Sequence, residues 1–170
     1  MTVPARLQRN NRPIVAHFDD QEVLWWRVPA KWSFSDDPPP PPGSGDWFKA
    51  LVVETFHWPN QSFNRSSQSE AADLLIGQDP SQCSIVRFPV SSVRTIFTVP
   101  RGEGIKRKHQ NQYEVDVEHV PLETNYAHSE LAIVKNGARL HSGEARKVTP
   151  PARNQIAAGI ASAAALEPRP

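Results

Sequence analysis

The chain has 170 residues, of which 38% are hydrophobic and 17 are prolines. This length fits one domain with its own hydrophobic core, but the low hydrophobic share and the high proline count assign part of the chain to loops and tails. The formal net charge of +1 gives no field that would hold a nucleic acid or an anionic lipid surface. No apolar run approaches the ~20 residues of a membrane span. We therefore expect neither a nucleic-acid partner nor a membrane partner.

The first residues of the chain have no apolar stretch like that of a secretory signal, and the single cysteine, Cys83, excludes an internal disulfide. Both features predict a cytoplasmic protein. Residues 1–17 mix arginine, asparagine and proline without periodicity. This composition predicts a flexible or draped N-terminal arm.

A β-branched and aromatic run at residues 23–28, VLWWRV, predicts the first strand, which Pro29 ends by removing a backbone donor. A Pro-rich loop follows at residues 36–46, where five consecutive prolines precede Gly-Ser-Gly. Such a run adopts polyproline II and serves either as a stiff spacer or as a ligand for an SH3-like or WW-like domain. Residues 48–58, with an apolar centre, predict a second strand.

The clearest helix pattern begins with Ser67 and Glu70, which have the spacing of a capping box ahead of an apolar stretch. Gly77 lies where a left-handed C-terminal cap is expected. Residues 84–88 then predict a buried strand. A short second helix is predicted after Pro89 because four apolar residues have the spacing of one helical face: Val90, Val93, Ile96 and Phe97.

The second half of the chain predicts further strands. A basic, glycine-bearing cluster at residues 101–109 is either a solvated hairpin tip or an anion contact. Residues 113–119 alternate strictly between apolar and acidic side chains, which predicts a half-exposed strand. Residues 130–141 predict a β-hairpin, because Asn136 and Gly137 supply positive φ at both central positions of a type I′ turn.

The C-terminal tail comprises residues 147–170. Near its start, Pro150 and Pro151 break regular structure. The alanine-rich part that follows predicts a docking helix over residues 153–166. Together the elements predict an α+β fold in a single domain, residues 18–146. The expected architecture is a small mixed or antiparallel sheet of about five to six strands with two short helices and a C-terminal helical tail.

Candidate chemistry is concentrated in residues 119–130, which hold four side chains of the types that bind metals: His119, Glu123, His128 and Glu130. Pro121 prevents a helix from bringing the two histidines onto one face, so they converge only across a strand, a loop and a strand. Three interpretations stay open: a crossover held by polar side chains, a metal site, and a catalytic site.

Arg27 is the second candidate because it lies between apolar neighbours, Trp26 and Val28, in the first strand. An unpaired buried charge would cost several kcal/mol in order of magnitude. The guanidinium therefore either reaches solvent with its aliphatic stem packed on a tryptophan, or contacts an anion or nucleotide. No glycine-rich phosphate loop, nucleophile elbow or paired-cysteine motif accompanies it, so the sequence predicts no particular cofactor.

Three short segments carry a resemblance: Leu24, Arg27, Pro29 and Trp32, then Ser62, Phe63, Asn64 and Arg65, and finally His119, Pro121, Asn125 and His128. In this order they resemble a group of small uncharacterised bacterial proteins. The resemblance covers about residues 22–134 and implies a shared fold without an activity. The chain is also similar in layout to ADP-ribosyltransferase-like domains, since it has an arginine on the first strand, then a serine-bearing segment and a late glutamate.

The first functional hypothesis is a small cytoplasmic bacterial interaction or regulatory module with a protein partner, based on the proline spacer and on Trp47 and Trp58 as exposed aromatics. The alternatives are a nucleotide-using transferase-like enzyme and a His/Glu metal protein. The candidate catalytic residues are Arg27, His128 and Glu130, and the candidate binding residues are Trp32, Arg65, Asn125 and His119.

Overall fold

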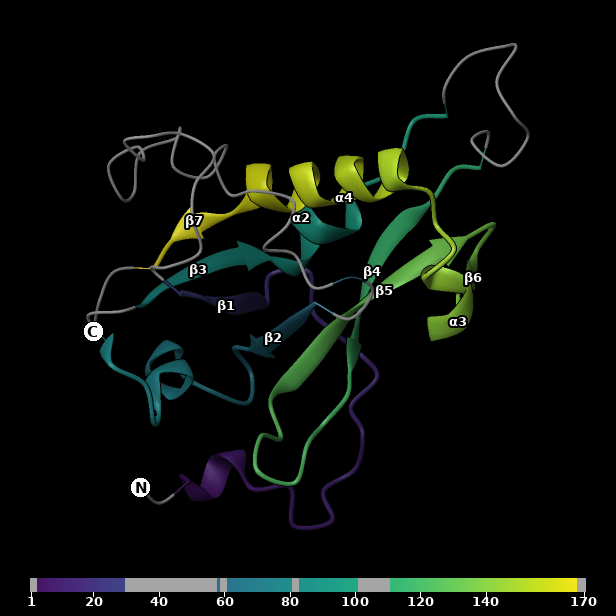
Figure 1. Ribbon diagram of the computed structural model, residues 1–170. Helices are drawn as coiled ribbons and strands as arrows, with labels where there is room; N and C mark the ends of the chain where they lie inside the picture. The colour runs from purple at the N-terminus through teal and green to yellow at the C-terminus, as the bar shows by residue number, and fades with distance from the viewer. Residues whose placement is uncertain (1–2, 30–57, 59–60, 81–82, 101–110, 168–170) are drawn as a thin grey trace, which may run out of the picture.

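The computed structural model describes residues 3–29, 58, 61–80, 83–100 and 111–167. The strands in this part of the chain are β1 (Val23–Pro29), β2 (Ser62–Arg65), β3 (Cys83–Pro89), β4 (Glu114–His119), β5 (His128–Lys135), β6 (Ala138–Arg139) and β7 (Ala165–Leu166) (Figure 1). The helices are α2 (Val90–Arg94), α3 (Ser142–Ala145) and α4 (Pro150–Ala163), with 3-10 helices η1 (Ala5–Leu7) and η3 (Ala71–Leu75).

Within the described residues, all strands belong to one sheet with the order β4-β5-β2-β1-β3-β7, and β6 pairs with β5. Every pairing is antiparallel. The predicted α+β class is therefore confirmed. The strand β2 was not predicted, although it joins β5 to β1 at the centre of the sheet.

Helices α2 and α4 cover one face of the sheet (Figure 1). Leu24, Trp26 and Val28 alternate along β1 and are all buried on this face. The ring of Phe63 from β2 lies edge-on to Trp26 and to Phe88, with ring centroids 6.4 Å and 5.0 Å away. This face carries the main hydrophobic core.

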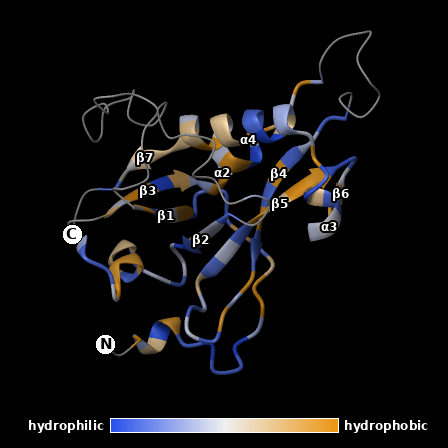
Figure 2. Cartoon of the chain, in the orientation of Figure 1, coloured by the Kyte–Doolittle hydropathy of each residue, from blue (hydrophilic) through white to orange (hydrophobic). Residues whose placement is uncertain are grey.

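The strand β5 changes character along its length, from the hydrophilic start His128–Ser129–Glu130 to an apolar second half (Figure 2). In the apolar half, Leu131 and Ile133 pair with Val117 and Val115 of β4 and are buried with them. The hydrophilic half lies beside β2. Polar side chains therefore gather where β2 and the start of β5 meet.

The other face of the sheet is covered by η3 and by the N-terminal arm. The 3-10 helix η3 lies against β1. Leu7 of the arm is buried, and Arg6 donates to the Asp73 carboxylate of η3 at 2.7 and 3.0 Å. The arm is therefore draped on the domain and forms part of its interior.

The cap of η3 differs from the predicted capping box. Glu70, not Ser67, precedes the helix, and the Asp73 carboxylate accepts the Glu70 backbone N–H at 2.9 Å. The Ser67 hydroxyl instead donates to Glu22 at 2.5 Å. The helix is a five-residue 3-10 helix, and Gly77 has the predicted left-handed conformation, with φ +73°.

The predicted turn at Asn136 and Gly137 is confirmed: their φ angles are 53° and 73°, and the turn joins β5 to β6. The helix after Pro89 is also present as α2, with Val90 and Val93 fully buried. Phe97 does not continue this apolar face. It lies beyond the helix and is 56% exposed.

The C-terminal helix α4 begins at Pro150, and the two prolines occupy its first turn instead of preceding it. Proline is tolerated there because the first backbone N–H groups of a helix have no partner inside it. Ile156 and Ile160 are buried in the main core. The predicted tail helix is thus present, begins and ends three residues earlier than expected, and is a core element.

Gly159 allows α4 to approach the segment that follows α2 closely, because a Cβ at this position would lie 2.8 Å from Cγ2 of Ile96. We expect Gly159→Ala to lower the free energy of unfolding by up to about 2 kcal/mol, since overpacking outweighs the gain in helix propensity. Gly143→Ala is the control, because a Cβ there meets nothing within 4 Å. Thermal unfolding of both variants tests this, and an increase in Tm for Gly159→Ala would contradict it.

Several predictions lie outside the described residues: the Pro-rich loop 36–46, the second strand 48–58 apart from Trp58, and the basic cluster 101–109. In the part of the chain that the structure does describe, no helix has the length and apolarity needed to cross a membrane.

Candidate functional site

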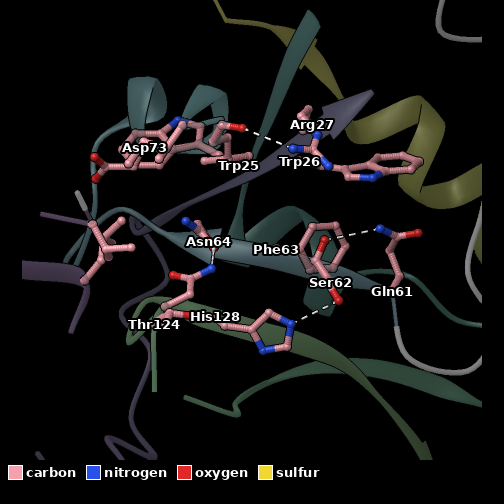
Figure 3. Close-up of a pocket in the computed structure, with 15 residues that line it drawn as sticks. Trp25, Trp26, Arg27, Gln61, Ser62, Phe63, Asn64, Asp73, Thr124 and His128 are labelled. Carbon is pink, nitrogen blue, oxygen red and sulfur yellow. Dashed lines mark hydrogen bonds between the residues drawn. The ribbon is translucent and has the colours of Figure 1, made fainter. Parts of the chain in front are cut away.

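A pocket of about 450 Å³ lies on the face of the sheet opposite to α4, between β1, β2, the start of β5, η3 and the arm (Figure 3). This volume is in the range of pockets that bind small molecules. Val3 and Leu7 of the arm and Leu74 and Ile76 near η3 contribute apolar walls. The polar lining comes mainly from the sheet.

Strand register builds the floor of the pocket. Trp25 of β1 pairs with Asn64 of β2, and Asn64 pairs with His128 of β5, so that these three side chains form one row across the sheet. Arg27 and Ser62 each lie two residues along from this row. Side chains two residues apart on a strand share a face, so both point to the same side as the row.

His128 and Ser62 form a hydrogen-bonded pair with a defined proton arrangement (Figure 3). Nδ1 of His128 lies 2.8 Å from the Val120 carbonyl oxygen, and Nε2 lies 3.0 Å from Oγ of Ser62. A carbonyl only accepts, so Nδ1 carries the proton and donates it. Nε2 therefore accepts the Ser62 hydroxyl proton. His128 is 9% exposed, whereas Ser62 is exposed to the pocket.

Glu130 adds a negative charge beside this pair. It pairs with Ser62 across the strands, and its Oε1 lies 4.0 Å from Nε2 of His128. Its side chain is 18% exposed. A carboxylate at this distance stabilises an imidazolium that forms when His128 accepts a proton.

Arg27 is the arginine that lines the pocket, and the residue is half-buried. Its one hydrogen bond to a described residue is a long contact of 3.4 Å from Nη1 to the Leu74 carbonyl, and no described carboxylate pairs with it. A guanidinium has five N–H donors. Most of the hydrogen-bonding capacity of Arg27 is therefore available to a ligand in the pocket.

The segment between β4 and β5 is a hairpin loop and not the predicted crossover, and Asn125 connects this loop to the floor of the pocket. Its Nδ2 donates to Oδ1 of Asn64 at 2.8 Å, and both residues line the pocket. Asp73 also lines the pocket, but its carboxylate is neutralised by Arg6. The structure thus brings together Arg27, His128 and Asn125 of the predicted site residues, with Glu130 beside His128.

Arg65 lies outside the pocket, in a structural cluster. Its side chain is 3% exposed, and Nε and Nη2 each donate to the Glu22 carboxylate at 2.8 Å. It also donates to the carbonyls of Val15 and His17, and its guanidinium lies 3.8 Å from the centre of the Phe18 ring. These contacts fasten the arm to the sheet.

His119 is also structural in its contacts and is 2% exposed. Its Nδ1 accepts the Val15 backbone N–H at 2.9 Å, so Nε2 carries the proton and donates to the Tyr126 carbonyl at 2.5 Å. The Tyr126 ring lies edge-on to the imidazole at 4.9 Å. Both ring nitrogens are occupied by backbone groups.

The geometry of residues 119–130 does not support the predicted metal site. Among the residues that the structure describes, no group of three or more His, Cys, Asp or Glu side chains is arranged to hold a metal ion. His119 is engaged on both nitrogens, and Glu123 is exposed beside Arg9.

Sequence reasoning did not identify Ser62, Asn64 or Trp25 as site residues. Ser62 and Asn64 alternate with the buried Phe63, which is the period of a strand, but the segment is too short and polar to stand out. Trp32, a predicted binding residue, lies outside the described residues.

No family model, curated protein or solved structure matches this chain. The resemblance to small bacterial proteins therefore stays a prediction.

Proposed function

We propose that the protein is a transferase-like enzyme that binds a phosphate-bearing, nucleotide-like ligand in this pocket. The observation that carries the proposal is that Arg27, with most of its donors unengaged, lines the same pocket as the hydrogen-bonded pair of His128 and Ser62. A partly buried cation without a carboxylate partner favours an anion, and the planar guanidinium binds phosphate through two parallel hydrogen bonds.

The other linings of the pocket fit the same class of ligand. The half-buried indole of Trp25 offers an aromatic surface of the kind on which a nucleobase stacks. The exposed Thr124 hydroxyl offers a polar partner for a sugar. His128, with Nε2 unprotonated, has the tautomer of a general base.

The interaction-module hypothesis has no comparable support in the described residues. Trp58 is half-buried and its indole N–H donates to the Ala145 carbonyl at 2.9 Å, so it packs on the domain. Trp47 lies outside the part of the chain that is described. A protein partner stays a prediction that co-purification from the native host would test.

Arg27→Gln is expected to weaken binding of a phosphate-bearing ligand by about 10- to 100-fold, from the ~1.5–3 kcal/mol of hydrogen bonds to a charged group. The measurement is calorimetric titration and thermal shift with NAD, ADP-ribose, AMP and ribose 5-phosphate. Adenosine, which lacks phosphate, should bind wild type and variant equally.

Arg146→Gln is the matched control, because Arg146 is exposed and lies outside the pocket. It should leave all affinities unchanged. Failure of every phosphate-bearing compound to bind the wild-type protein at millimolar concentration would overturn the proposal, as would equal affinities for wild type and Arg27→Gln.

A further inference from the structure

We infer that Ser62 is the nucleophile of this pocket and that it forms a covalent bond to the phosphorus of a phosphate ester. The inference rests on the proposed function in taking the pocket as the substrate site. It adds the reaction class, phosphoryl or nucleotidyl transfer through a seryl intermediate, and a role for Ser62, which was not among the predicted site residues.

The hydrogen bond between Ser62 and His128 has a defined direction. Because the Val120 carbonyl fixes the proton on Nδ1, Nε2 has a free lone pair and the Ser62 hydroxyl points its proton at it, with 3.0 Å between the two heavy atoms. A serine hydroxyl is a weak nucleophile until an adjacent base removes its proton. Here the base is already in contact and in the required tautomer.

The base, His128, is held in a fixed orientation. The Val120 backbone N–H donates to the His128 carbonyl at 3.1 Å while the His128 ring donates to the Val120 carbonyl, so backbone and side chain are held by the same neighbour. This carbonyl takes the place of the carboxylate that orients the histidine in a serine–histidine–aspartate triad. Glu130 lies 4.0 Å from Nε2 and supplies the negative charge that stabilises the imidazolium.

The nucleophile is accessible from the pocket, and the pocket favours an anionic electrophile. Ser62 is exposed, whereas His128 beneath it is nearly buried, so the hydroxyl oxygen is the atom that meets a ligand. Arg27 lines the same pocket, and a guanidinium stabilises the negative charge on the non-bridging oxygens of a transferring phosphoryl group. An anionic phosphorus centre fits this pair of groups better than a neutral ester does.

The reaction that follows balances without a further reagent. The Oγ of Ser62 attacks phosphorus, its proton passes to Nε2 of His128, and the bond between phosphorus and the leaving oxygen breaks, with that oxygen taking the proton. Water or an acceptor hydroxyl then gives its proton to Nε2 and attacks the same phosphorus. The bond between phosphorus and Oγ breaks and Ser62 recovers its proton.

The test is covalent labelling of the full chain with diisopropyl fluorophosphate, a neutral phosphorus electrophile that releases fluoride when an activated serine attacks it. Peptide mass mapping should place the label on Ser62. Ser62→Ala should abolish the label, and His128→Gln should slow it by about 10²- to 10⁴-fold, the usual contribution of a general base. Ser142→Ala and His141→Gln, which replace exposed residues outside the pocket, should label at the wild-type rate.

The mapping on wild-type protein keeps the test valid if a variant does not fold. Label spread over many serines, or absent from Ser62, would overturn the inference. A second measurement is the hydrolysis of bis(4-nitrophenyl) phosphate, which releases 4-nitrophenolate. An equal rate of release by the wild-type protein and by Ser62→Ala would overturn the inference as well.

The two proposals fail separately. Labelling of Ser62 and binding of nucleotides are separate measurements on the wild-type protein, of which the first reports on Ser62 with His128 and the second on Arg27. If Ser62 is labelled but no nucleotide binds, the nucleophile stands and the nucleotide-binding function fails. If nucleotides bind through Arg27 but Ser62 is not labelled, the binding function stands and the covalent mechanism is wrong.

Discussion

Replacing Arg65 with methionine is expected to lower the free energy of unfolding by about 3–5 kcal/mol, because it leaves the Glu22 carboxylate buried without its cation. The two side chains are 3% and 5% exposed, and two hydrogen bonds of 2.8 Å join them. The variant also loses the bonds from Arg65 to the Val15 and His17 carbonyls, which hold the arm. Chemical denaturation measures the change.

Arg9→Met is the matched control, because Arg9 forms an ion pair with Glu123 at 3.5 Å in which the two side chains are 34% and 79% exposed. Exposed pairs contribute about 0–1 kcal/mol. The double variant Glu22→Leu/Arg65→Met should be more stable than the sum of its single changes predicts, since it leaves no unpaired charge. A loss below about 1 kcal/mol for Arg65→Met would show that the pair does not stabilise the fold.

The same pair predicts how stability changes in acid. Burial alone would raise the pKa of Glu22, but hydrogen bonds from Arg65 and Ser67 outweigh burial and hold the pKa below its ordinary value. The unfolded chain then binds a proton at a higher pH than the folded chain does. The stabilisation by Glu22 is therefore complete above about pH 4.3, the ordinary glutamate value, and is lost as the pH falls through the lower pKa of the folded state.

Local patterns in the sequence predicted the elements whose structure is decided locally. The alternation along residues 114–119 became β4, with every second side chain buried. Asn136 and Gly137 adopted the positive φ angles of the predicted turn. In these cases neighbouring residues specify the conformation, and the rest of the fold agrees with them.

The central strand β2 was missed because its stability comes from distant residues. Three of its four side chains are polar, and such a segment does not stand out as a strand. It is held by β1 and β5 on either side and by the ion pair between Arg65 and Glu22, which are 43 residues apart. None of these partners is visible in the segment itself.

The two arginines of the predicted site illustrate a further limit. Arg27 and Arg65 were both predicted as site residues. In the structure the Arg65 side chain donates four hydrogen bonds, two to the Glu22 carboxylate and two to the Val15 and His17 carbonyls. Arg27 instead faces the pocket and makes one long hydrogen bond to a described residue. Residue type predicts that an arginine needs an anion, but only the fold decides whether the protein supplies it.

His119→Ala is expected to lower the free energy of unfolding by about 2–5 kcal/mol, because it leaves one buried and one partly buried backbone group without partners, at roughly 1–3 kcal/mol each. These groups are the Val15 N–H, which donates to Nδ1, and the Tyr126 carbonyl, which accepts from Nε2. His141→Ala is the control, since His141 is exposed. Equal losses in the two variants would contradict the structural role of the buried imidazole.

The hydrogen bonds of His119 also require a neutral ring, which gives a second measurement. Burial lowers the pKa of His119, the nearby Arg65 charge acts in the same direction, and the bond to the Tyr126 carbonyl opposes both. In the unfolded chain the ring titrates near its ordinary value of about 6.5, so below that pH the unfolded state binds a proton that the folded state does not. Stability should therefore fall as the pH drops below about 6.5 and level off below the lowered pKa.

The variant His119→Asn isolates this effect, because asparagine does not titrate and the other histidines remain. Its stability should change less between pH 7 and pH 5 than that of the wild-type protein. Protonation of His119 would turn Nδ1 into a donor and break its bond with the Val15 N–H. The Val15 amide should accordingly exchange its hydrogen faster, relative to its intrinsic rate, as the pH falls. Identical profiles of stability against pH for the wild-type protein and His119→Asn would mean that His119 is not the titrating group. Because the same stretch of arm is held by Arg65, release at Val15 would loosen the arm that also supplies Leu7 to the pocket wall.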